Sequence, residues 1–458
     1  MSDGTALETP RAFAAVILAA GKGTRMKSAR HKVLHDIAGK PMLAHLMDEM
    51  KRLAPAETVV VLGDGREQVE PLVGGHGGTV AVQGEQLGTG HAALMAKEKL
   101  QGFEGDILVC FGDVPMVRAE TAAAMLERLN AGDAPATVVL GFRPPDALAY
   151  GRIIADDAGT IAKMVEHKDA SAEERAVDLC NSGLIATRGA DLFALLEKVG
   201  NDNAQGEYYL PDIVMVALGE GRASAVIEAE PWEVDGINSR AELAAVERRW
   251  QDRRRAEAMA EGVTLVDPAT VWFSHDTIIG SDVAIEPHVR FGPGVEIGND
   301  VMIHAFSHIE GATVHEGATI GPFARLRPGA VMEKGSKVGN FVEMKKAVLG
   351  EGAKANHLTY LGDATVGANA NIGAGTITCN YDGFFKYQTV IGAGAFIGSN
   401  SALVAPVVIG QGAIVGAGSV VTSDVEADAL ALARGDQSAK PGWAKRFREA
   451  MTKKKAGK

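Results

Sequence analysis

A glycine-rich turn with two basic side chains is the first feature that could do chemistry. Residues 18–26 read Leu-Ala-Ala-Gly-Lys-Gly-Thr-Arg-Met and end an apolar run. Gly21 and Gly23 would let the backbone approach a ligand closely, and Lys22 and Arg25 add positive charge. Backbone N–H groups and cations in such a turn can cradle a phosphate. The segment lacks the Gly-Lys-Ser/Thr ending of a Walker loop, and Gly-x-Gly alone would also fit a tight strand–helix turn.

A carboxylate stands at the end of a second apolar run. Asp113 follows residues 106–111, and ligands bind α/β sheets at the carboxyl ends of their strands. Mg²⁺ takes few protein carboxylates and draws other ligands from substrate phosphates, so Asp113 suits a Mg²⁺ site. A lone Asp at a strand end can also be a simple cap or turn.

A histidine in the C-terminal half has polar and cationic neighbours that a purely structural segment does not need. His357 lies in the string 356–363, with Arg327 and Lys345 upstream and Lys386 downstream. Histidine titrates near neutral pH and can act as a general base. The alternative is a structural or surface histidine.

The N-terminal half must position the first two features. From residue 13 to about 236, apolar strand-like runs alternate with helical patterns, which predicts an α/β domain, Rossmann-like, with a mostly parallel sheet. Strands are expected at 14–20, 58–62, 79–82, 106–111 and 137–142. Helices are expected at 42–53, 90–100, 119–130 and 190–199.

Large apolar residues recur every six positions across the C-terminal half. Neither a helix nor an alternating strand has that period, but a parallel β-helix of hexapeptide repeats does. The series comprises Ile279, Ile285, Phe291, Ile297, Val301, Ile303, Ile309, Val314, Ile320, Leu326, Met332, Val338, Met344, Leu349, Tyr360, Val366, Ile372, Thr378, Ile391, Ile397, Leu403, Ile409, Val415 and Val421. The widest break, residues 379–386, predicts a loop outside the coil, where function usually lies.

One charged helix is expected between the two halves. Ser239 and Glu242 form a capping-box pair and Gly262 is a stop signal, so the helix should be a solvated strut. We expect a first domain at 1–236, a linker helix at 237–262 and a second domain at 263–458. The β-helix should end near Val425, and the basic end 453–458 should be disordered.

Bulk properties exclude several classes of protein. A net charge of −12 argues against nucleic acid or a membrane surface as partner. Cys110, Cys180 and Cys379 match no metal spacing or disulfide framework and suit a reducing cytosol. The apolar run 13–20 is too short to span a bilayer, and Gly-Lys-Gly follows it instead of a cleavage site. We therefore expect a cytoplasmic protein.

The string around the glycine-rich turn, with Lys32 downstream, resembles the signature of sugar-1-phosphate nucleotidyltransferases. Residues 83–92 look like that family's base-reading loop, since a Gln side chain and backbone groups can read a pyrimidine edge. The resemblance implies catalysis by Arg25 and Lys32, and Mg²⁺ on Asp113 and Asn238. The residues implied to bind UTP or the UDP-sugar are Leu18, Ala19, Ala20, Gly21, Gly23, Lys32, Gln83, Gly88, Thr89, Asp113, Gly151, Glu166, Asn181 and Asn238. Phe111 departs from the Tyr that the family often has.

Two further strings, His-Leu-Thr-Tyr-Leu-Gly-Asp and Asn-Ile-Gly-Ala-Gly-Thr-Ile-Thr-Cys-Asn-Tyr-Asp-Gly, extend the resemblance. From about Ala14 to Arg434 the chain resembles the bacterial bifunctional N-acetylglucosamine-1-phosphate uridylyltransferase / glucosamine-1-phosphate N-acetyltransferase family. The resemblance implies a left-handed β-helix that forms a homotrimer, with His357 as base and Glu343 orienting it. Sugar-phosphate contacts are implied for Arg327, Lys345, Tyr360, Asn371 and Lys386. Acetyl-CoA contacts are implied for Ala374, Asn380, Tyr381, Ser399, Ala417 and Arg434.

The resemblance implies a cytoplasmic enzyme with two reactions. Acetyl-CoA acetylates glucosamine 1-phosphate, and UTP then reacts with N-acetylglucosamine 1-phosphate in the presence of Mg²⁺. The product would feed peptidoglycan and lipopolysaccharide synthesis. Two alternatives stay open: a monofunctional nucleotidyltransferase with a structural β-helix, and a non-catalytic scaffold that binds sugar nucleotides.

Overall fold

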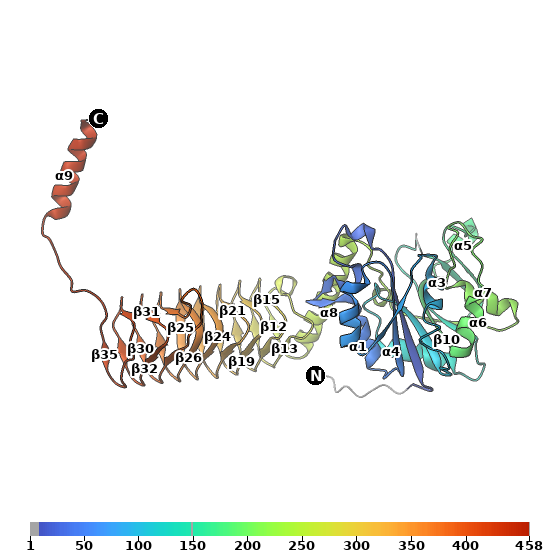
Figure 1. Ribbon diagram of the computed structural model, residues 1–458, viewed down its shortest axis with the longest axis horizontal. Coiled ribbons are helices and arrows are strands. Elements are labelled where there is room, and N and C mark those ends of the chain that lie inside the picture. Colours follow the sequence, from blue (N-terminus) through green and yellow to red (C-terminus); the bar gives the residue numbers. More distant parts are fainter. Residues whose placement is uncertain (1–8, 148–149, 458) are drawn as a thin grey trace. The chain divides into compact units, whose positions relative to one another are not determined.

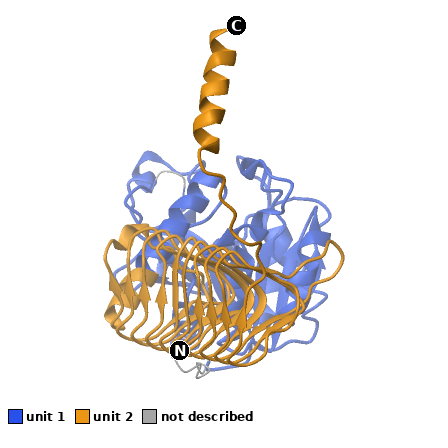
Figure 2. Cartoon of the chain, turned by 90° about the vertical axis from the view of Figure 1, so that its left-hand side faces the viewer, with its two compact units in different colours: residues 1–253 blue, residues 254–458 orange. Residues whose placement is uncertain are grey.

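The computed structural model describes residues 9–147 and 150–457. The chain forms two compact units, residues 1–253 and 254–458 (Figure 2). None of the helices in the described part of the chain combines the length and the apolar character that crossing a bilayer requires.

The first unit is built on a mixed sheet whose main path runs in the order β11-β7-β10-β6-β1-β4-β5 (Figure 1). Its strands are β1 (Phe13–Ala19), β4 (Glu57–Leu62), β5 (Thr79–Val82), β6 (Asp106–Phe111), β7 (Thr137–Phe142), β10 (Cys180–Arg188) and β11 (Ala225–Glu228), with β8 (Arg152–Ala155) and β9 (Ile161–Val165) at the side. Only β10 on this path runs antiparallel to its neighbours. The predicted mostly parallel α/β fold is confirmed.

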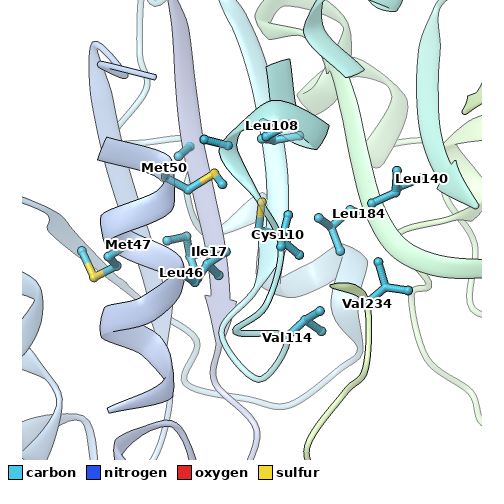
Figure 3. Close-up of a cluster of buried hydrophobic side chains, with 14 of the residues drawn as sticks. Ile17, Leu46, Met47, Met50, Leu108, Cys110, Val114, Leu140, Leu184 and Val234 are labelled. Atoms are coloured by element: carbon cyan, nitrogen blue, oxygen red, sulfur yellow. The ribbon is translucent and has the colours of Figure 1, made fainter. Parts of the chain in front are cut away.

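Helices cover both faces of this sheet, and the residues of β1 alternate between the two cores. Ile17 packs with α1 (Met42–Lys51) and α4 (Ala119–Leu129), and Figure 3 shows Leu46 of α1 beside it. Val16 packs in the second core with helices α3 (Thr89–Leu94), α6 (Gly189–Leu196) and α7 (Asp212–Gly219). A strand that is buried on both faces must be apolar throughout, which explains the continuous run in the sequence.

Smaller elements complete this unit. They are the hairpin β2 (Asp36–Ile37) and β3 (Lys40–Pro41), and the short helices α2 (Glu70–Gly75) and α5 (Ala172–Arg175). The helix predicted at 90–100 is shorter than expected, because α3 ends at Leu94. Beyond it the N–H groups of Ala96 and Lys97 bond to carbonyls only three residues back, so the chain continues as turns.

The second unit is a parallel β-helix, as predicted from the six-residue period (Figure 1). One face stacks β12 (Thr264–Leu265), β14 (Ala284–Ile285), β17 (Met302–Ile303), β20 (Thr319–Ile320), β23 (Lys337–Asn340), β25 (Lys354–His357), β27 (Asn371–Ile372), β30 (Phe396–Ile397), β33 (Ile414–Val415) and β35 (Leu430–Ala431). The coil therefore extends beyond Val425, to β35.

The other two faces are joined by two long strands, β24 (Glu343–Leu349) and β26 (Tyr360–Val366), which continue around a corner. One face contains β13 (Ile278–Ile279), β16 (Glu296–Ile297), β19 (Ala312–Val314), β22 (Ala330–Met332), β29 (Thr389–Ile391) and β32 (Val407–Ile409). The other contains β15 (Arg290–Phe291), β18 (His308–Ile309), β21 (Arg325–Leu326), β28 (Ile377–Cys379), β31 (Ala402–Val404) and β34 (Val420–Val421).

The six-residue series points into the coil with two exceptions. Most of its members are at most 4% exposed, but Ile279 is only half-buried. At the slip before Tyr360 the inward residue is Leu361, which is 0% exposed, and Tyr360 is half-buried. The period of six would place Tyr360 in the interior, and that expectation is wrong by one position, because the pleat of β26 sends neighbouring side chains to opposite sides.

The linker helix α8 (Arg240–Ala260) is less solvated than its charges suggest. Val246, Gln251, Arg255 and Ala258 are at most 5% exposed. Arg255 donates from Nη1 to the carbonyl of Val271 at 2.9 Å, so this charged side chain caps the first coil rather than facing water.

The basic end also differs from its expected disorder. Residues Trp443–Ala456 form helix α9, with no buried side chain, and Lys458 lies outside the described residues. Lys, Arg, Ala and Met favour helix, and the rings of Trp443 and Phe447 stack one turn apart with centroids at 5.1 Å.

Candidate active sites

A cavity of about 340 Å³ opens at the carboxyl ends of β1, β5 and β6. Its lining comprises Leu18, Ala19, Ala20, Gly21, Lys32, Val33, Gln83, Gln86, Gly88, Thr89, Ala92, Phe111, Asp113 and Glu207. Nine of these were predicted as ligand-binding residues from four separate stretches of sequence. The edge of the sheet brings them together because parallel strands all end on the same side.

Lys32, Asp113 and Asn238 meet at one side of this cavity. Lys32 Nζ donates to Asn238 Oδ1 at 2.9 Å and to Asp113 Oδ2, and the Lys32 and Asp113 side chains are only 10% and 20% exposed. The N–H of Ile237 bonds to the carbonyl of Asp113 at 2.9 Å, which holds Asn238 beside a residue 125 positions away.

These contacts test whether the site suits Mg²⁺. One carboxylate oxygen and one amide oxygen converge on a single cationic atom, Lys32 Nζ. Hard oxygen ligands in small number are what Mg²⁺ takes from protein when phosphates supply the remainder. The donor set of Asp113 and Asn238 therefore fits this metal.

The start of α8 anchors Asn238, in a variant of the predicted capping box. Ser239 Oγ accepts from the N–H of Glu242 at 3.3 Å, as expected. Glu242, however, accepts from the N–H of Asn238 at 2.6 Å, one residue earlier than a standard box would have it. The cap thus fixes the backbone of Asn238 as well as the helix end.

Backbone hydrogen bonds with Tyr208 hold the loop 83–92, which was predicted to read the base. The N–H of Tyr208 donates to the carbonyl of Leu87, and the N–H of Gly90 donates to the carbonyl of Tyr208, both at 2.8 Å. Gly88 has φ +109°, and a Cβ there would lie 2.5 Å from the Tyr208 carbonyl oxygen, so the loop needs glycine. Thr89 Oγ1 accepts from the N–H of Leu210 at 3.0 Å.

The glycine-rich turn places its cations less centrally than expected. Gly23 has φ +58°, and a Cβ there would lie 2.7 Å from Lys32 Cβ, so glycine allows Lys32 to approach. Lys22 forms an ion pair with Asp64 at 2.9 Å. The Arg25 side chain is exposed and does not line the cavity.

A second, narrow hollow brings together the three residues expected to contact the sugar, Gly151, Glu166 and Asn181. The N–H of Asn181 donates to the carbonyl of Gly151 at 2.9 Å, and a Cβ on Gly151 would lie 3.2 Å from Glu166 Oε1. Asp212 also lines this hollow. Sequence reasoning missed it, although its position after Pro211 at the start of a helix is a recognisable cap signal.

The surroundings of Glu166 and Asp212 disfavour the ionised form of both carboxyl groups. Burial raises the pKa of Glu166, and the charge of Asp212 raises it further. Burial also raises the pKa of Asp212, to about 6, with a contribution from Asp169. Arg152 also lines the hollow, but its guanidinium donates to the carbonyls of Tyr150 and Arg175. The two carboxyl groups suit ligands that donate hydrogen bonds, such as hydroxyl groups.

We expect Asp212→Asn to raise the melting temperature at pH 7.5 by about 2–4 °C. Folding raises the pKa of the Asp212 carboxyl from its ordinary value of 3.8 to about 6. The protonated carboxyl therefore contributes to stability below pH 3.8, and this contribution is lost as the pH rises towards about 6. The gain should therefore vanish at pH 4. Thermal melts of both proteins at the two pH values measure it.

Asp133→Asn is the matched control for that experiment. The ion pair with Arg128 lowers the pKa of Asp133, so its removal should slightly lower stability at pH 7.5. An Asp212→Asn protein that melts at or below the wild-type temperature at pH 7.5 would contradict the assigned direction.

Three cations gather on the β-helix. Arg327 and Lys345 follow the paired residues Leu326 and Met344 on successive coils, and Lys386 comes from the loop 379–386. Repulsion from Lys386, and then from Arg327, lowers the pKa of Lys345. The residue paired with Lys345 on the following coil is Gly362, and the Tyr360 hydroxyl occupies the space where a Cβ of Gly362 would lie. Such a cluster can bind a phosphate.

His357 ends β25, and its hydrogen-bond partner is not the expected one. Its Nδ1 is 2.6 Å from Asn340 Oδ1, and the two residues are paired in β25 and β23. Because an amide oxygen only accepts, Nδ1 bears the proton and Nε2 is left as the basic nitrogen. Glu343, expected to orient His357, instead accepts from Arg327 Nη1 at 2.7 Å. Asn340 was not among the predicted site residues, although it lies only three residues before Glu343.

Three predicted acetyl-CoA residues form a column along one corner of the coil. Ala374, Ser399 and Ala417 each accept from the coil that follows: from Asn400 N at 2.7 Å, Gly418 N at 2.8 Å and Arg434 Nη1 at 2.6 Å, respectively. Arg434, another of the predicted acetyl-CoA contacts, therefore lies at the end of this column.

The remaining predicted residues lie close to this region. Asn371 begins β27, one coil after Lys354 of β25. Asn380 is 7% exposed and donates to Asp363 Oδ2 at 2.5 Å, whereas Tyr381 is 60% exposed and donates to the carbonyl of Gly383. On a single chain His357, Ser399, Ala417 and Arg434 are also exposed.

Comparison with known proteins agrees with both halves. A family model described as a MobA-like NTP transferase domain matches residues 15–175, and one described as bacterial transferase hexapeptide (six repeats) matches 276–311 and 388–423. The bifunctional protein GlmU of Rhizorhabdus wittichii is 67% identical over 450 residues, covering 98% of this chain and 100% of that protein.

Two further relatives extend this result. The bifunctional protein GlmU of Sphingopyxis alaskensis is 63% identical over 97% of this chain and 98% of its own length. The bifunctional protein GlmU of Zymomonas mobilis is 58% identical over 96% of this chain and 99% of its own length. The chain therefore belongs to the GlmU family of bifunctional enzymes, in which a nucleotidyltransferase domain precedes a left-handed β-helix of hexapeptide repeats with acyltransferase function.

Proposed function

We propose that this enzyme makes UDP-N-acetylglucosamine by two transfers. Acetyl-CoA acetylates glucosamine 1-phosphate in the C-terminal domain, residues 263–458. UTP then reacts with the resulting N-acetylglucosamine 1-phosphate in the N-terminal domain, residues 1–236, and pyrophosphate leaves; residues 237–262 link the two. The convergence of Lys32, Asp113 and Asn238 on a cavity that also contains the base-reading loop is the observation that carries the second reaction.

Uridylyl transfer requires positioning and charge neutralisation more than a side-chain nucleophile. A phosphate oxygen of the sugar phosphate attacks the α-phosphorus in line with the departing pyrophosphate. Lys32 supplies positive charge at the cavity wall, and Arg25 would add charge from the glycine-rich turn. Asp113 and Asn238 would hold Mg²⁺, which when bound neutralises charge developing on the phosphates.

The narrow hollow would receive the sugar ring. Glu166 accepts hydrogen bonds from hydroxyl groups, and Asn181 holds the N-acetyl group or a hydroxyl. Gly151 leaves room because a side chain there would meet Glu166 Oε1. The raised pKa of Glu166 agrees with a partner that donates hydrogen bonds rather than an anion.

Acetyl transfer requires a free amine, yet an aminosugar is largely ammonium near neutral pH. His357 Nε2 takes the proton as the amine nitrogen attacks the thioester carbonyl, and the C–S bond to CoA breaks. The proton then passes to the CoA thiolate, which leaves as the thiol. Asn340 holds the ring in the required tautomer through Nδ1. Glu343 acts on Arg327 and so helps to position a phosphate contact.

The cation cluster of Arg327, Lys345 and Lys386 would bind the sugar phosphate, with Tyr360 and Asn371 beside it. Acetyl-CoA would lie along the column of Ala374, Ser399 and Ala417. Arg434 would meet a CoA phosphate, and Asn380 and Tyr381 the acyl end. The exposure of Tyr381, Ser399, Ala417 and Arg434 on one chain supports a site completed by neighbouring subunits.

A homotrimer through the β-helix would supply those neighbours. Phe306, Phe323 and Phe341 stack along one edge with centroids 5.0 and 5.2 Å apart, and each is about half exposed. A row of exposed apolar rings is typical of an interaction surface. Sedimentation equilibrium measures the assembly, and a monomer at assay concentration would contradict it. We propose that the enzyme acts in the cytoplasm on small substrates.

A paired assay on the purified protein tests the proposed function. One arm follows free thiol from acetyl-CoA and glucosamine 1-phosphate, and the other follows pyrophosphate from UTP and N-acetylglucosamine 1-phosphate with Mg²⁺. We expect turnover in both. Pyrophosphate without thiol would leave a monofunctional nucleotidyltransferase, and sugar-nucleotide binding without turnover in either arm would leave a scaffold.

A further inference from the structure

The amide of Gln83 is held in one orientation by two contacts. Gln83 directly follows β5, lines the cavity and is only 5% exposed. Its Nε2 lies 3.2 Å from the carbonyl oxygen of Gly88 and 3.1 Å from His91 Nδ1. A carbonyl oxygen can only accept, so the amide atom that faces Gly88 must be the nitrogen.

That assignment determines the state of His91, the third residue of α3. Both hydrogens of the Gln83 amide are donated, one to Gly88 and one to His91. His91 Nδ1 must therefore accept, and its ring is neutral with the proton on Nε2. His91 is half-buried and does not line the cavity, so it reaches a ligand only through Gln83.

The second contact is what prevents the amide from turning. The terminal torsion of glutamine is soft, so a single hydrogen bond to Gly88 would leave the amide plane free to rotate. His91 lies on the first turn of α3 and Gly88 is the residue that caps this turn, and the Tyr208 contacts hold both in place. Gln83 Oε1 accepts no hydrogen bond from the residues that the structure describes, and it remains the amide's polar atom for a ligand.

We propose that His91 is a positioning residue that makes this site specific for uracil by directing Gln83 Oε1 at the base. The inference rests on the proposed use of UTP. Uracil has a donor, N3–H, on its pairing edge, and a fixed acceptor such as Oε1 matches it. Cytosine has an acceptor at N3, so the same oxygen meets a lone pair, and a wrongly paired buried group weakens binding.

Two substitutions separate the acceptor from the rest of the ring. His91→Ala removes the acceptor, whereas in His91→Asn the Oδ1 atom can occupy the place of Nδ1 and accept from Gln83. We expect the ratio of kcat/KM for UTP to that for CTP to fall about tenfold in His91→Ala, mainly through a higher KM for UTP. The Asn variant should stay within about twofold of the wild type.

His76→Ala is the matched control, since His76 is another half-buried histidine of the same unit outside the cavity. It should leave the UTP to CTP ratio unchanged. An unchanged ratio in His91→Ala, or equal losses in the Ala and Asn variants, would overturn the inference while the proposed function stands. Wild-type protein that releases no pyrophosphate from UTP would overturn the proposed function and this inference together.

Discussion

Replacing Asp113 by alanine should reduce pyrophosphate release from UTP on the order of a hundred- to a thousandfold. Among the residues that the structure describes, two side-chain oxygens accept from Lys32 Nζ at this position, one from the Asp113 carboxylate and one from the neutral amide of Asn238. Without Asp113 the site loses its anionic metal ligand, and Lys32 loses its ion-pair partner. Initial rates at saturating Mg²⁺ and UTP measure the effect.

The same preparation should keep its acetyltransferase rate, because Asp113 belongs to the first unit and the cation cluster to the second. Asp64→Ala is the matched control, since Asp64 is an exposed carboxylate of the same unit that forms an ion pair with Lys22. Pyrophosphate release within about threefold of the wild type in Asp113→Ala would rule out the assigned role.

His357→Ala should lower CoA release from acetyl-CoA and glucosamine 1-phosphate by roughly 10²–10⁴-fold while uridylyl transfer continues. The loss should be largest near neutral pH, where the aminosugar must be deprotonated during attack, and should lessen at alkaline pH, where free amine is abundant. Asn340→Ala should lose less, because it removes only the group that selects the tautomer of the ring. A thiol-reactive dye follows the reaction over a pH series.

His315→Ala provides the control for this second prediction. His315 is an exposed histidine of the same β-helix, 3.7 Å from Glu333, and lies outside the cation cluster. Its substitution should leave both reactions unchanged. If His357→Ala retained full acetyl transfer, the β-helix would be a structural element and the general base would have to be sought elsewhere.

Much of the first site could be predicted because each piece is local. The turn 18–26 and the loop 83–90 combine glycine with charged or amide residues within a few positions, and their strands are continuous apolar runs. The position of Asn238 came from resemblance alone, since nothing near it in the chain marks a site. The position of Asp212 after Pro211 marks the start of a helix but no ligand site, because Asp212 meets Glu166 only after α7 packs beside β9.

At the second site, too, the sequence predicted some features and only the folded structure decided others. A strict period of six predicted which side chains fill the coil, but the slip before Tyr360 shifted the pattern by one residue, and Leu361 took the interior place. Spacing along the chain likewise could not tell that Asn340, rather than Glu343, faces His357. Residues 17 positions apart become neighbours on successive coils only when the length of each turn is known.

The sequence by itself determined the two-part architecture and the direction of most side chains that fill the β-helix, and it supplied the candidate site residues. These properties depend on local propensity and on periodicity, which are written along the chain. Tertiary structure decided which polar atoms pair: Lys32 with Asp113 and Asn238, Gln83 with His91, and Arg327 with Glu343. The physical reason is that a hydrogen bond depends on distances of about 3 Å between atoms, and only packing of distant segments sets distances on that scale.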